Sequence, residues 1–257
     1  MDSTQNRPLA VVLLSGGMDS ITAAGIALQE GFELALIHFN YGQKTEEAEL
    51  RAFGRIASFF GVPAERRLVV HTNFFTLAGG SALTEGGRAI PPADLGSKKI
   101  PPTYVPFRNA VLLSMAVGWA EVLGARTVYY GAVSQDSSGY PDCRPAFVDA
   151  YNRLVDAGTK PETAIQIRAP LLDMTKADII RTAAKLALPL DLTWSCYARN
   201  DLACGACDSC ALRLRGFEAA GIADPIPYAR SVAAAAEARL EKARRLRTLL
   251  RALTGSA

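Results

Sequence analysis

The stretch Leu9-Ala10-Val11-Val12-Leu13-Leu14-Ser15-Gly16-Gly17-Met18-Asp19-Ser20 decides the fold. It begins with six apolar residues, which is typical of a strand buried on both faces of a parallel sheet. A turn of serine and glycine follows, and residues 21–28 continue with a spacing that is compatible with a helix. A strand that leads through a tight glycine turn into a helix is the first unit expected of an α/β fold.

The same alternation continues on the C-terminal side of this stretch, with short connections. It predicts a doubly wound, Rossmann-like parallel sheet. Thr175 is the expected N-cap of one helix, with Asp178 in its first turn. The expected strands are residues 33–39, 65–70, 127–131 and 165–168, and the expected helices are residues 46–60, 109–122, 146–155 and 175–186.

Two regions depart from the alternation. Residues 72–102 are dense in glycine and proline, and a loop of this length inside a domain predicts a mobile flap over an active site. Residues 231–253 form an alanine- and arginine-rich stretch that predicts a C-terminal helix. We therefore expect a main domain at residues 1–190 and a smaller segment with a helical tail at residues 191–257.

Composition excludes several classes of protein. Of the 257 residues, 49% are hydrophobic and 21% are charged, as in ordinary globular domains. The net charge of +3 shows no concentrated basic field, so a nucleic-acid partner is not expected. No apolar stretch approaches the roughly 20 residues that span a membrane, and residues 1–8 lack a signal-peptide layout. We expect a cytoplasmic protein.

The turn after the first strand carries the chemistry of a phosphate-binding loop. The N-terminus of a helix presents unpaired backbone N–H groups, and two glycines let a phosphate approach them closely. Ser15 and Ser20 add hydroxyl donors, and Asp19 is placed to cap the helix or to hold Mg²⁺. The Walker pattern and the dinucleotide pattern G-x-G-x-x-G are both absent, and an ordinary strand–helix turn stays open as the alternative.

Ser15-Gly16-Gly17-Met18-Asp19-Ser20 resembles the signature Ser-Gly-Gly-x-Asp-Ser of the PP-loop ATP pyrophosphatases. The resemblance implies an adenine nucleotide alpha hydrolase-like fold and cleavage of ATP between its α- and β-phosphates. Transfer of AMP to a carboxylate creates a good leaving group, and the protein aligns the atoms and neutralises charge. We expect the ATP-binding residues to be Leu14, Ser15, Gly16, Gly17, Met18, Asp19, Ser20, Ile21, Thr22, Ala23 and Ala24.

Four of the five cysteines fall together near the C-terminus. Cys196, Cys204, Cys207 and Cys210 form a set of four thiolates, which suits one tetrahedral Zn²⁺ per chain. A full set of four leaves no open coordination position, so the metal is predicted to be structural. An iron–sulfur cluster is the competing interpretation. Cys143 lies outside the set.

Three further motifs stand where the sheet should have its carboxyl edge, at which open α/β sheets bind ligands. They are Phe39-Asn40-Tyr41-Gly42-Gln43-Lys44, Thr103-Tyr104-Val105-Pro106-Phe107-Arg108-Asn109 and Ser138-Gly139-Tyr140-Pro141-Asp142-Cys143-Arg144. Each residue alone has a structural explanation, such as a rigid turn at Pro106 or an N-cap at Asp142. The two histidines, His38 and His71, are expected in packing or surface roles.

Taken with the loop and the cysteines, these motifs resemble the bacterial 7-cyano-7-deazaguanine synthases (QueC) of queuosine biosynthesis. The likeness runs over residues 9–228 and includes Pro170-Leu171-Leu172 and Lys176-Ala177-Asp178-Ile179-Ile180. It implies an ATP-dependent ligase that turns 7-carboxy-7-deazaguanine and ammonia into 7-cyano-7-deazaguanine, a nitrile, through adenylated intermediates and an amide. It also implies a homodimer, to which the tail helix would contribute.

The resemblance further implies the roles of single residues. Asp19, Lys176 and Arg108 are the expected catalytic residues, with Lys176 on the ATP phosphates. An arginine such as Arg108 can bind the substrate carboxylate through two parallel hydrogen bonds. A carboxylate such as Asp142 can accept hydrogen bonds from the donors on one edge of a guanine-like ring. The expected substrate-binding residues are Tyr41, Gln43, Arg108, Asn109, Asp136, Gly139, Tyr140 and Asp142.

Four positions depart from the pattern of this family, namely Phe107, Ser134, Ser137 and Ala146. Because of these departures, a related reaction stays open, in which the enzyme stops at the amide or attaches a deazaguanine to another molecule. Two other classes also stay open. One is a PP-loop enzyme that modifies tRNA, although no added RNA-binding domain and no catalytic cysteine pair are evident. The other is a non-enzymatic zinc-ribbon interaction module, which would leave the phosphate loop unexplained.

Overall fold

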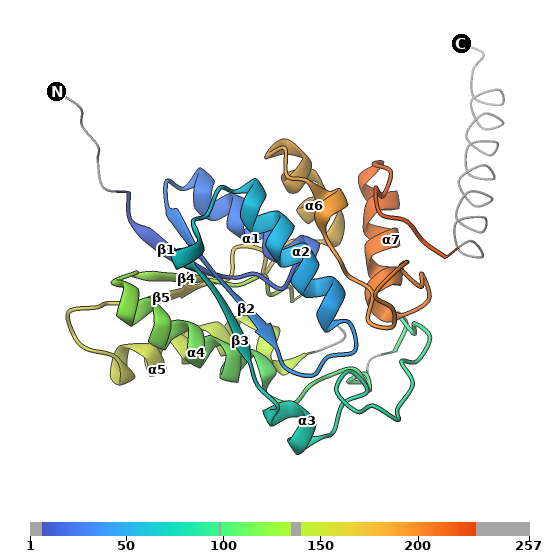
Figure 1. The fold of residues 1–257 in the computed structure, drawn as a ribbon, viewed down its shortest axis with the longest axis horizontal. Coiled ribbons are helices and arrows are strands. Elements are labelled where there is room, and N and C mark those ends of the chain that lie inside the picture. The colour runs from blue at the N-terminus through green and yellow to red at the C-terminus, as the bar shows by residue number, and fades with distance from the viewer. Residues whose placement is uncertain (1–6, 98, 135–139, 230–257) are drawn as a thin grey trace, which may run out of the picture.

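The computed structural model describes residues 7–97, 99–134 and 140–229. Within these residues one sheet of five parallel strands forms the centre, in the order β3-β2-β1-β4-β5 (Figure 1). The central strand β1 pairs with β2 on one side and with β4 on the other. The strands are β1 (Leu9–Leu13), β2 (Glu33–Asn40), β3 (Arg67–His71), β4 (Thr127–Tyr129) and β5 (Gln166–Arg168). The predicted doubly wound parallel sheet is confirmed.

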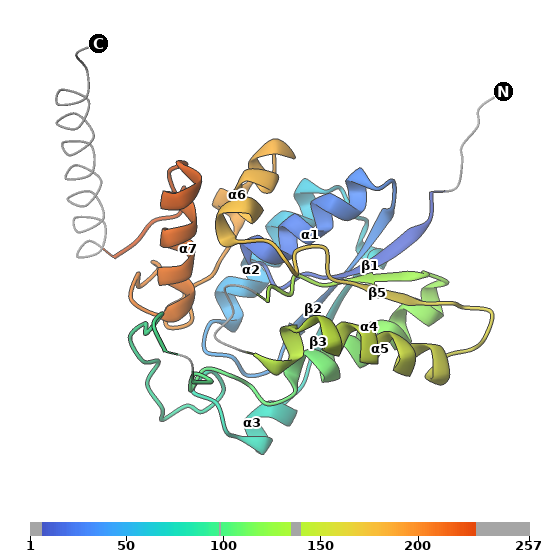
Figure 2. The ribbon, with the colours of Figure 1, turned by 180° about the vertical axis from the view of Figure 1, so that it is seen from behind.

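Helices cover both faces of the sheet (Figures 1 and 2). Ala10 and Val12 of β1 face a core shared with α1, α2 and α6, whereas Val11 faces the core shared with α4 and α5. All three side chains are fully buried, which explains why the strand is an unbroken apolar run. The helices are α1 (Met18–Gln29), α2 (Glu46–Phe59), α3 (Phe74–Ala78), α4 (Arg108–Leu123), α5 (Pro145–Gly158), α6 (Lys176–Lys185) and α7 (Asp208–Ala220).

The sheet reverses its winding between β1 and β4. The chain leaves β1 into α1 on one face and returns to β4 from α4 on the other face. At such a switch point the two connections diverge, and a crevice opens beyond the carboxyl ends of the two strands. The expected ligand-binding motifs begin at this crevice.

The expected cap of α6 is present. The backbone N–H of Asp178 donates to the Thr175 hydroxyl at 3.2 Å, and the backbone N–H of Thr175 donates to the Asp178 carboxylate at 3.2 Å. This reciprocal pair is a capping box, which satisfies two donors that a helix start leaves unpaired. It fixes the position of Lys176, the first residue of α6.

The segment at residues 72–102 contains one short helix, α3, in place of an uninterrupted loop. Phe75 of α3 is buried in the core beside α4, and the Ala82 N–H donates to the Pro102 carbonyl at 2.8 Å. The Ala93 N–H donates to the Ala206 carbonyl at 2.8 Å, so the segment reaches the cysteine region, as Figure 1 also shows. Its motion as a flap stays a prediction.

Helix α7 begins directly after Cys207, contains Cys210 and was not among the expected elements. It packs against α6 so closely that a Cβ on Gly216 would lie 2.7 Å from the Lys176 Cβ. The cysteine segment is thereby held against the main sheet. The expected tail helix at residues 231–253 lies outside the described residues. None of the described helices is both long and apolar enough to cross a membrane.

Candidate active site and metal centre

The phosphate loop turns sharply between β1 and α1. Gly16 has a φ of +88°, a conformation that residues with a side chain rarely adopt. A Cβ at this position would also lie 2.8 Å from the backbone oxygen of Glu49 in α2. The Ser20 hydroxyl donates to the Gly17 carbonyl at 2.9 Å, and no side chain caps the start of α1. The first N–H groups of α1 are therefore available to an anion.

A cavity of about 290 Å³ opens from this loop. Six of the expected ATP-binding residues line it, whereas Gly16 packs against α2. Ile21, Thr22, Ala23 and Ala24 are fully buried within α1, so they shape the loop from behind. The lining residues of the expected set are Leu14, Ser15, Gly17, Met18, Asp19 and Ser20.

Asp19 and Lys176 form an ion pair on the cavity wall. The distance from the Lys176 Nζ to the Asp19 Oδ2 is 2.6 Å, and the Asp19 Oδ1 is buried without a hydrogen-bond partner. Asp19 lies in the first turn of α1, and Lys176 begins α6. The pair thus places one cation and one free carboxylate oxygen beside the phosphate loop.

Arg108 and Tyr41 form the second polar group of the cavity. Arg108 begins α4 and donates to the Tyr41 hydroxyl at 2.9 Å, with its guanidinium carbon 5.6 Å from the ring centroid. Burial opposes the charge on Arg108, but the surrounding Tyr41, Tyr197 and Tyr140 hold its pKa above the ordinary value. A cation in this environment is suited to an anionic ligand group.

Tyr140 and Asn109 also line the cavity, as expected for substrate-binding residues. Tyr140 lies against Tyr104, with ring centroids 5.3 Å apart, and its hydroxyl is 3.4 Å from that of Thr103. Burial raises the pKa of Tyr140 above its ordinary value. The tyrosine hydroxyl therefore stays protonated and able to donate.

Two of the expected substrate-binding residues lie behind the cavity wall. The Gln43 amide accepts from the Tyr41 N–H at 2.8 Å and donates to Glu49 at 3.2 Å. The Asp142 Oδ2 accepts from the Asn109 N–H at 3.1 Å, and its Oδ1 is buried without a partner. Gln43 thus fixes Tyr41 and Asp142 fixes Asn109, and both of the fixed residues line the cavity. Direct contact of Gln43 and Asp142 with a ligand stays a prediction. Asp136 and Gly139 lie outside the described residues.

Glu49 also lines the cavity and was not among the residues predicted from the sequence. Burial raises the pKa of this carboxyl group to about 7, against the pull of Thr45, Gln43 and Arg108 toward the ionised form. The sequence did contain a signal, because Glu49 lies only six residues beyond Gln43 of the Tyr41-Gly42-Gln43 motif. On a predicted amphipathic helix, however, a glutamate is ordinarily assigned to the solvent face.

Trp194 and Tyr197 were missed as well, and both line the cavity from the chain that leads into the cysteines. The Trp194 N–H donates to the Gly16 carbonyl at 2.9 Å, and the Trp194 Nε1 is buried without a partner. Burial raises the pKa of Tyr197 well above its ordinary value. These residues join the phosphate loop to the cysteine segment.

The two histidines occupy the roles that were expected. His38 is buried, and its ring nitrogens lie 2.9 Å from the Leu14 carbonyl and 3.0 Å from the Asn40 Oδ1. Burial lowers its pKa below the ordinary value. His71 is exposed at the end of β3. Neither residue lines the cavity.

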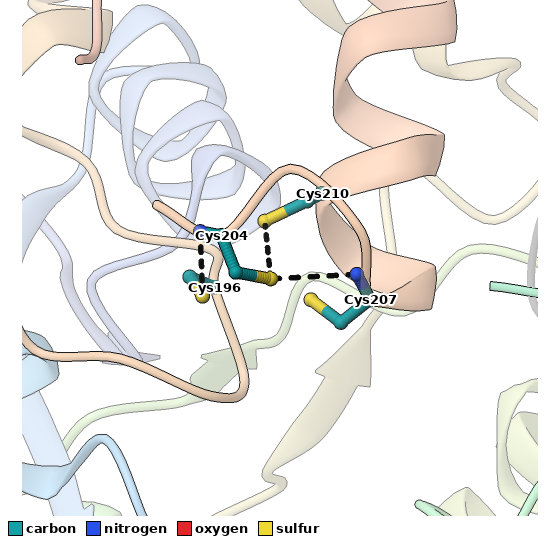
Figure 3. Close-up of side chains that lie close together, drawn as sticks. All are labelled: Cys196, Cys204, Cys207 and Cys210. Atoms are coloured by element: carbon teal, nitrogen blue, oxygen red, sulfur yellow. Dashed lines mark hydrogen bonds between the residues drawn. The ribbon is translucent and has the colours of Figure 1, made fainter. Parts of the chain in front are cut away.

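The four clustered cysteines converge on one point (Figure 3). Their sulfur atoms all lie within 4.8 Å of one another, and Cys196, Cys207 and Cys210 are buried. Backbone N–H groups point at two of the sulfurs, since Cys204 donates to Cys196 at 3.3 Å and Cys207 donates to Cys204 at 3.4 Å. This arrangement stabilises thiolates and can hold a metal ion.

The cysteine segment is tied to both walls of the cavity. Asn200 accepts from the Ala48 N–H at 3.0 Å and donates to the Lys44 carbonyl at 3.0 Å, which fixes the start of α2. Asp208, beside Cys207, accepts from the Asp94 N–H at 3.1 Å and lines the cavity. The cysteine segment therefore supports the residues around the phosphate loop.

The buried Arg213 organises the end of this segment. Its guanidinium contacts the Asp224 carboxylate at 2.9 Å, the Thr193 hydroxyl at 2.7 Å and the Ser195 hydroxyl at 3.1 Å. Its carbon lies 5.1 Å from the Phe217 ring centroid. Because Thr193 and Ser195 flank Trp194, Arg213 fixes the chain that contacts the phosphate loop.

Fold and site together define the class of the protein: an open α/β protein with a phosphate loop at the switch point of its sheet. Comparison with known families narrows the class. A family described as "Queuosine biosynthesis protein QueC" matches residues 9–221. The chain belongs to this family.

Similar proteins of known name agree with this assignment. A 7-cyano-7-deazaguanine synthase of Chlorobaculum parvum is 52% identical over 219 residues, which cover 85% of this chain and 96% of that protein. A protein of the same name from Chlorobium phaeobacteroides is 54% identical, with the same coverage. A solved NAD+ synthetase from Burkholderia pseudomallei is 16% identical, with a TM-score of 0.36 over 96% of this chain and 84% of that one. A likeness of that size adds no argument.

Proposed function

We propose that the protein is an ATP-dependent ligase that converts 7-carboxy-7-deazaguanine and ammonia to 7-cyano-7-deazaguanine. One observation carries the proposal: a single cavity is lined by the phosphate loop with Asp19 and Lys176 and by the pair of Arg108 and Tyr41. A nucleotide and an organic carboxylate can therefore meet there. The names of the relatives, 7-cyano-7-deazaguanine synthases, supply the particular product.

The nucleotide end of the cavity carries the first step. The N–H groups at the start of α1 and the hydroxyls of Ser15 and Ser20 hold the phosphates, and Lys176 neutralises their charge. Asp19 is the residue that would hold Mg²⁺, which supplies further charge neutralisation when it is bound. The substrate carboxylate attacks the α-phosphorus, the bond to the β-phosphate breaks, and pyrophosphate leaves.

The other end of the cavity holds the deazaguanine. Arg108 orients the carboxylate, and Tyr41 fixes the Arg108 fork by accepting its hydrogen bond. Tyr140 and Asn109 contact the ring system, and Asp142 holds Asn109 in place. We also propose Asp136 and Gly139 as substrate-binding residues. Gln43 acts through Tyr41. Orientation of this kind turns a reaction between separate molecules into one within a complex.

Ammonia then displaces AMP from the adenylated carboxylate and forms an amide. A second ATP activates the amide oxygen at the same site, and loss of AMP and a proton leaves the nitrile. Both activations use the same phosphate loop, because each transfers AMP to an oxygen on the same carbon of the substrate. No feature of the described residues favours an amide product, a conjugate, a tRNA substrate or a non-enzymatic role.

We further propose that the four cysteines hold one structural Zn²⁺. A tetrahedral ion with Zn–S bonds of about 2.3 Å requires sulfurs about 3.8 Å apart. The Cys204 and Cys210 sulfurs are 3.9 Å apart, and all four lie within 4.8 Å of one another. An iron–sulfur cluster places iron and sulfide atoms between its ligands and needs a wider spacing. The donor set therefore fits a single ion.

A direct assay tests the function. The protein is incubated with ATP, Mg²⁺, ammonium and 7-carboxy-7-deazaguanine, and AMP and the deazapurines are followed by mass spectrometry. Substrate-dependent AMP together with the nitrile supports the proposal. Absence of substrate-dependent AMP refutes the proposal. Accumulation of the amide without the nitrile would show that the reaction ends at the amide. Sedimentation measures the homodimer that we propose, and fractionation of the source cells measures the proposed cytoplasmic location.

A further inference from the structure

Glu49 is a carboxylate of the cavity wall to which the reaction steps above give no role. It lies in the first turn of α2 and shares the cavity with Tyr41 and Arg108. The Thr45 hydroxyl donates to its Oε1 at 2.7 Å, and the Gln43 amide donates to its Oε2 at 3.2 Å. Among the described residues, no lysine or arginine forms an ion pair with it. Its only close partners there are neutral groups.

The hydrogen bonds around Glu49 suit a group that gains and loses a proton. The Gln43 oxygen accepts from the Tyr41 N–H, so the amide nitrogen must face Glu49 and Oε2 must accept. Oε1, in contrast, faces the Thr45 hydroxyl, which can donate to a carboxylate or accept from a carboxylic acid. Both protonation states therefore keep their hydrogen bonds. Two of about four lone-pair positions are used, and the others remain for a ligand.

Burial and the groups around Glu49 together place its pKa near neutral pH. Burial raises the pKa to about 7, the hydrogen bonds from Thr45 and Gln43 and the charge of Arg108 lower it, and the charge of Glu46 on the same helix raises it. Tyr41 faces the carboxylate from the end of β2 and is itself kept protonated by burial. A base with a pKa near the working pH is the most effective proton acceptor.

The other carboxylates of the cavity are engaged differently. Asp19 is ion-paired with Lys176, and Asp208 begins α7 and accepts a backbone N–H from Asp94. Ammonia in neutral water is mostly ammonium, which carries no lone pair and cannot attack an acyl group. An enzyme that uses it must bind a small cation and remove one proton. Among the lining residues, Glu49 has the free acceptor positions for both tasks.

We propose that Glu49 binds ammonium and acts as the general base that releases ammonia toward the adenylated carboxylate. The proposal rests on the ligase function proposed above. The ammonium N–H bond breaks and its proton passes to Glu49 Oε1. The nitrogen lone pair forms the C–N bond, and the C–O bond to AMP breaks, with its electron pair leaving on AMP. A second proton passes from nitrogen to solvent water, and the neutral amide remains.

The test separates adenylation from ammonia transfer. Carboxylate-dependent exchange of labelled pyrophosphate into ATP, without ammonium, measures adenylation alone. We expect Glu49→Gln to keep this exchange within about threefold of the unsubstituted protein, because Glu49 is not required to form the adenylate. We expect its kcat/KM for ammonium to fall about 10²- to 10⁴-fold, the usual contribution of a general base. Glu47→Gln, an exposed neighbour on α2, is the matched control and should change neither quantity.

A second nucleophile sharpens the result. Hydroxylamine is mostly uncharged at neutral pH, so it needs no base to release its lone pair. Glu49→Gln should form the hydroxamate at nearly the unsubstituted rate. In the unsubstituted protein, kcat/KM for total ammonium should level off above about pH 7, once Glu49 is deprotonated, whereas in the variant it should keep rising with the fraction of free ammonia. An unchanged kcat/KM for ammonium in Glu49→Gln overturns the proposal, and so does equal loss with both nucleophiles. Absence of exchange in the unsubstituted protein would instead refute the ligase function.

Discussion

Lys176 and Asp19 lie 157 positions apart in the sequence, yet the Lys176 Nζ is 2.6 Å from the Asp19 Oδ2 beside the phosphate loop. The first turns of α1 and α6 meet at this contact. Without a nucleotide the two charges satisfy each other. In the proposed reaction, entry of the phosphates would give the lysine a second anionic partner and leave the carboxylate available to a cation. The ion pair would then keep the site electrically balanced before ATP binds.

Removal of the lysine charge should disable ATP use without unfolding the chain. We expect Lys176→Met to lower substrate-dependent AMP formation at least about 100-fold, the scale found when one group that stabilises a transition-state charge is removed. Steady-state AMP release and thermal unfolding measure the two effects. Lys185→Met, an exposed residue in the last turn of the same helix, is the control. Equal loss in both variants would contradict a specific role for Lys176.

The metal ligands should be required for folding of the segment that supports the cavity. We expect Cys207→Ser to lower zinc content below one ion per chain and to lower the unfolding temperature, because metal binding contributes directly to folding. Elemental analysis and calorimetry provide the measurements. Cys143→Ser should keep one zinc per chain, since Cys143 lies outside the cluster. Iron in place of zinc would contradict the prediction.

The buried Arg213 should be one of the most sensitive positions of the cysteine segment. Replacement by leucine leaves the Asp224 carboxylate buried without its cation, which costs about 3–5 kcal/mol of unfolding free energy. Denaturant unfolding measures the loss. Arg199→Leu breaks the exposed ion pair with Asp201 in the same segment and should change stability little. Similar losses of unfolding free energy in the two variants would contradict the prediction that burial of the ion pair determines the effect.

Phe107 adopts a left-handed backbone conformation, with a φ of 56°, and its side chain is 63% exposed. Glycine would relieve a steric strain of about 1 kcal/mol at such a position. It would also lose more conformational entropy on folding, at a similar cost in free energy. We expect Phe107→Gly to change unfolding free energy by less than about 1 kcal/mol. Because Phe107 does not line the cavity, the nitrile should remain the product. A change of product would show that this departure from the family pattern does affect the reaction.

Glu49 should leave a signature in the pH dependence of stability. Its pKa is raised from 4.5 to about 7, so the folded state binds the proton more tightly than the unfolded state. Stability from this group is therefore present below about pH 4.5 and is lost as the pH rises to about 7, by at most about 3 kcal/mol. Glu49→Gln should remove this decline. Parallel curves of unfolding free energy against pH for the two proteins would contradict the assigned pKa.

The fold was predictable because local patterns carried it. The apolar run before Ser15, the paired glycines and the Thr175 cap each specify a strand end or a helix start without help from distant residues. Helix α7 was missed because its sequence begins among the cysteines, directly after Cys207, and these were assigned to metal binding. The helix is stabilised by packing of Gly216 on α6, a contact that no local pattern predicts.

The site was predictable where its chemistry lies in one segment, as at the phosphate loop and the cysteine cluster. Glu49, Trp194 and Tyr197 were missed because they reach the cavity through tertiary packing. Gln43 and Asp142 lie in recognisable motifs, and their side chains hold Tyr41 and Asn109. Their contact with the substrate stays a prediction. A motif identifies the neighbourhood of a site more reliably than it separates contact residues from supporting ones.

The hydrogen bond from the Trp194 N–H to the Gly16 carbonyl lies two residues before the first metal ligand, Cys196. One short stretch of backbone thus connects the cysteine cluster to the glycine-rich loop. If the cysteines hold the proposed zinc, chains made in a cell deprived of zinc would lack this anchorage even while ATP is plentiful. Output of the enzyme would then follow the supply of trace metal as well as the supply of ATP.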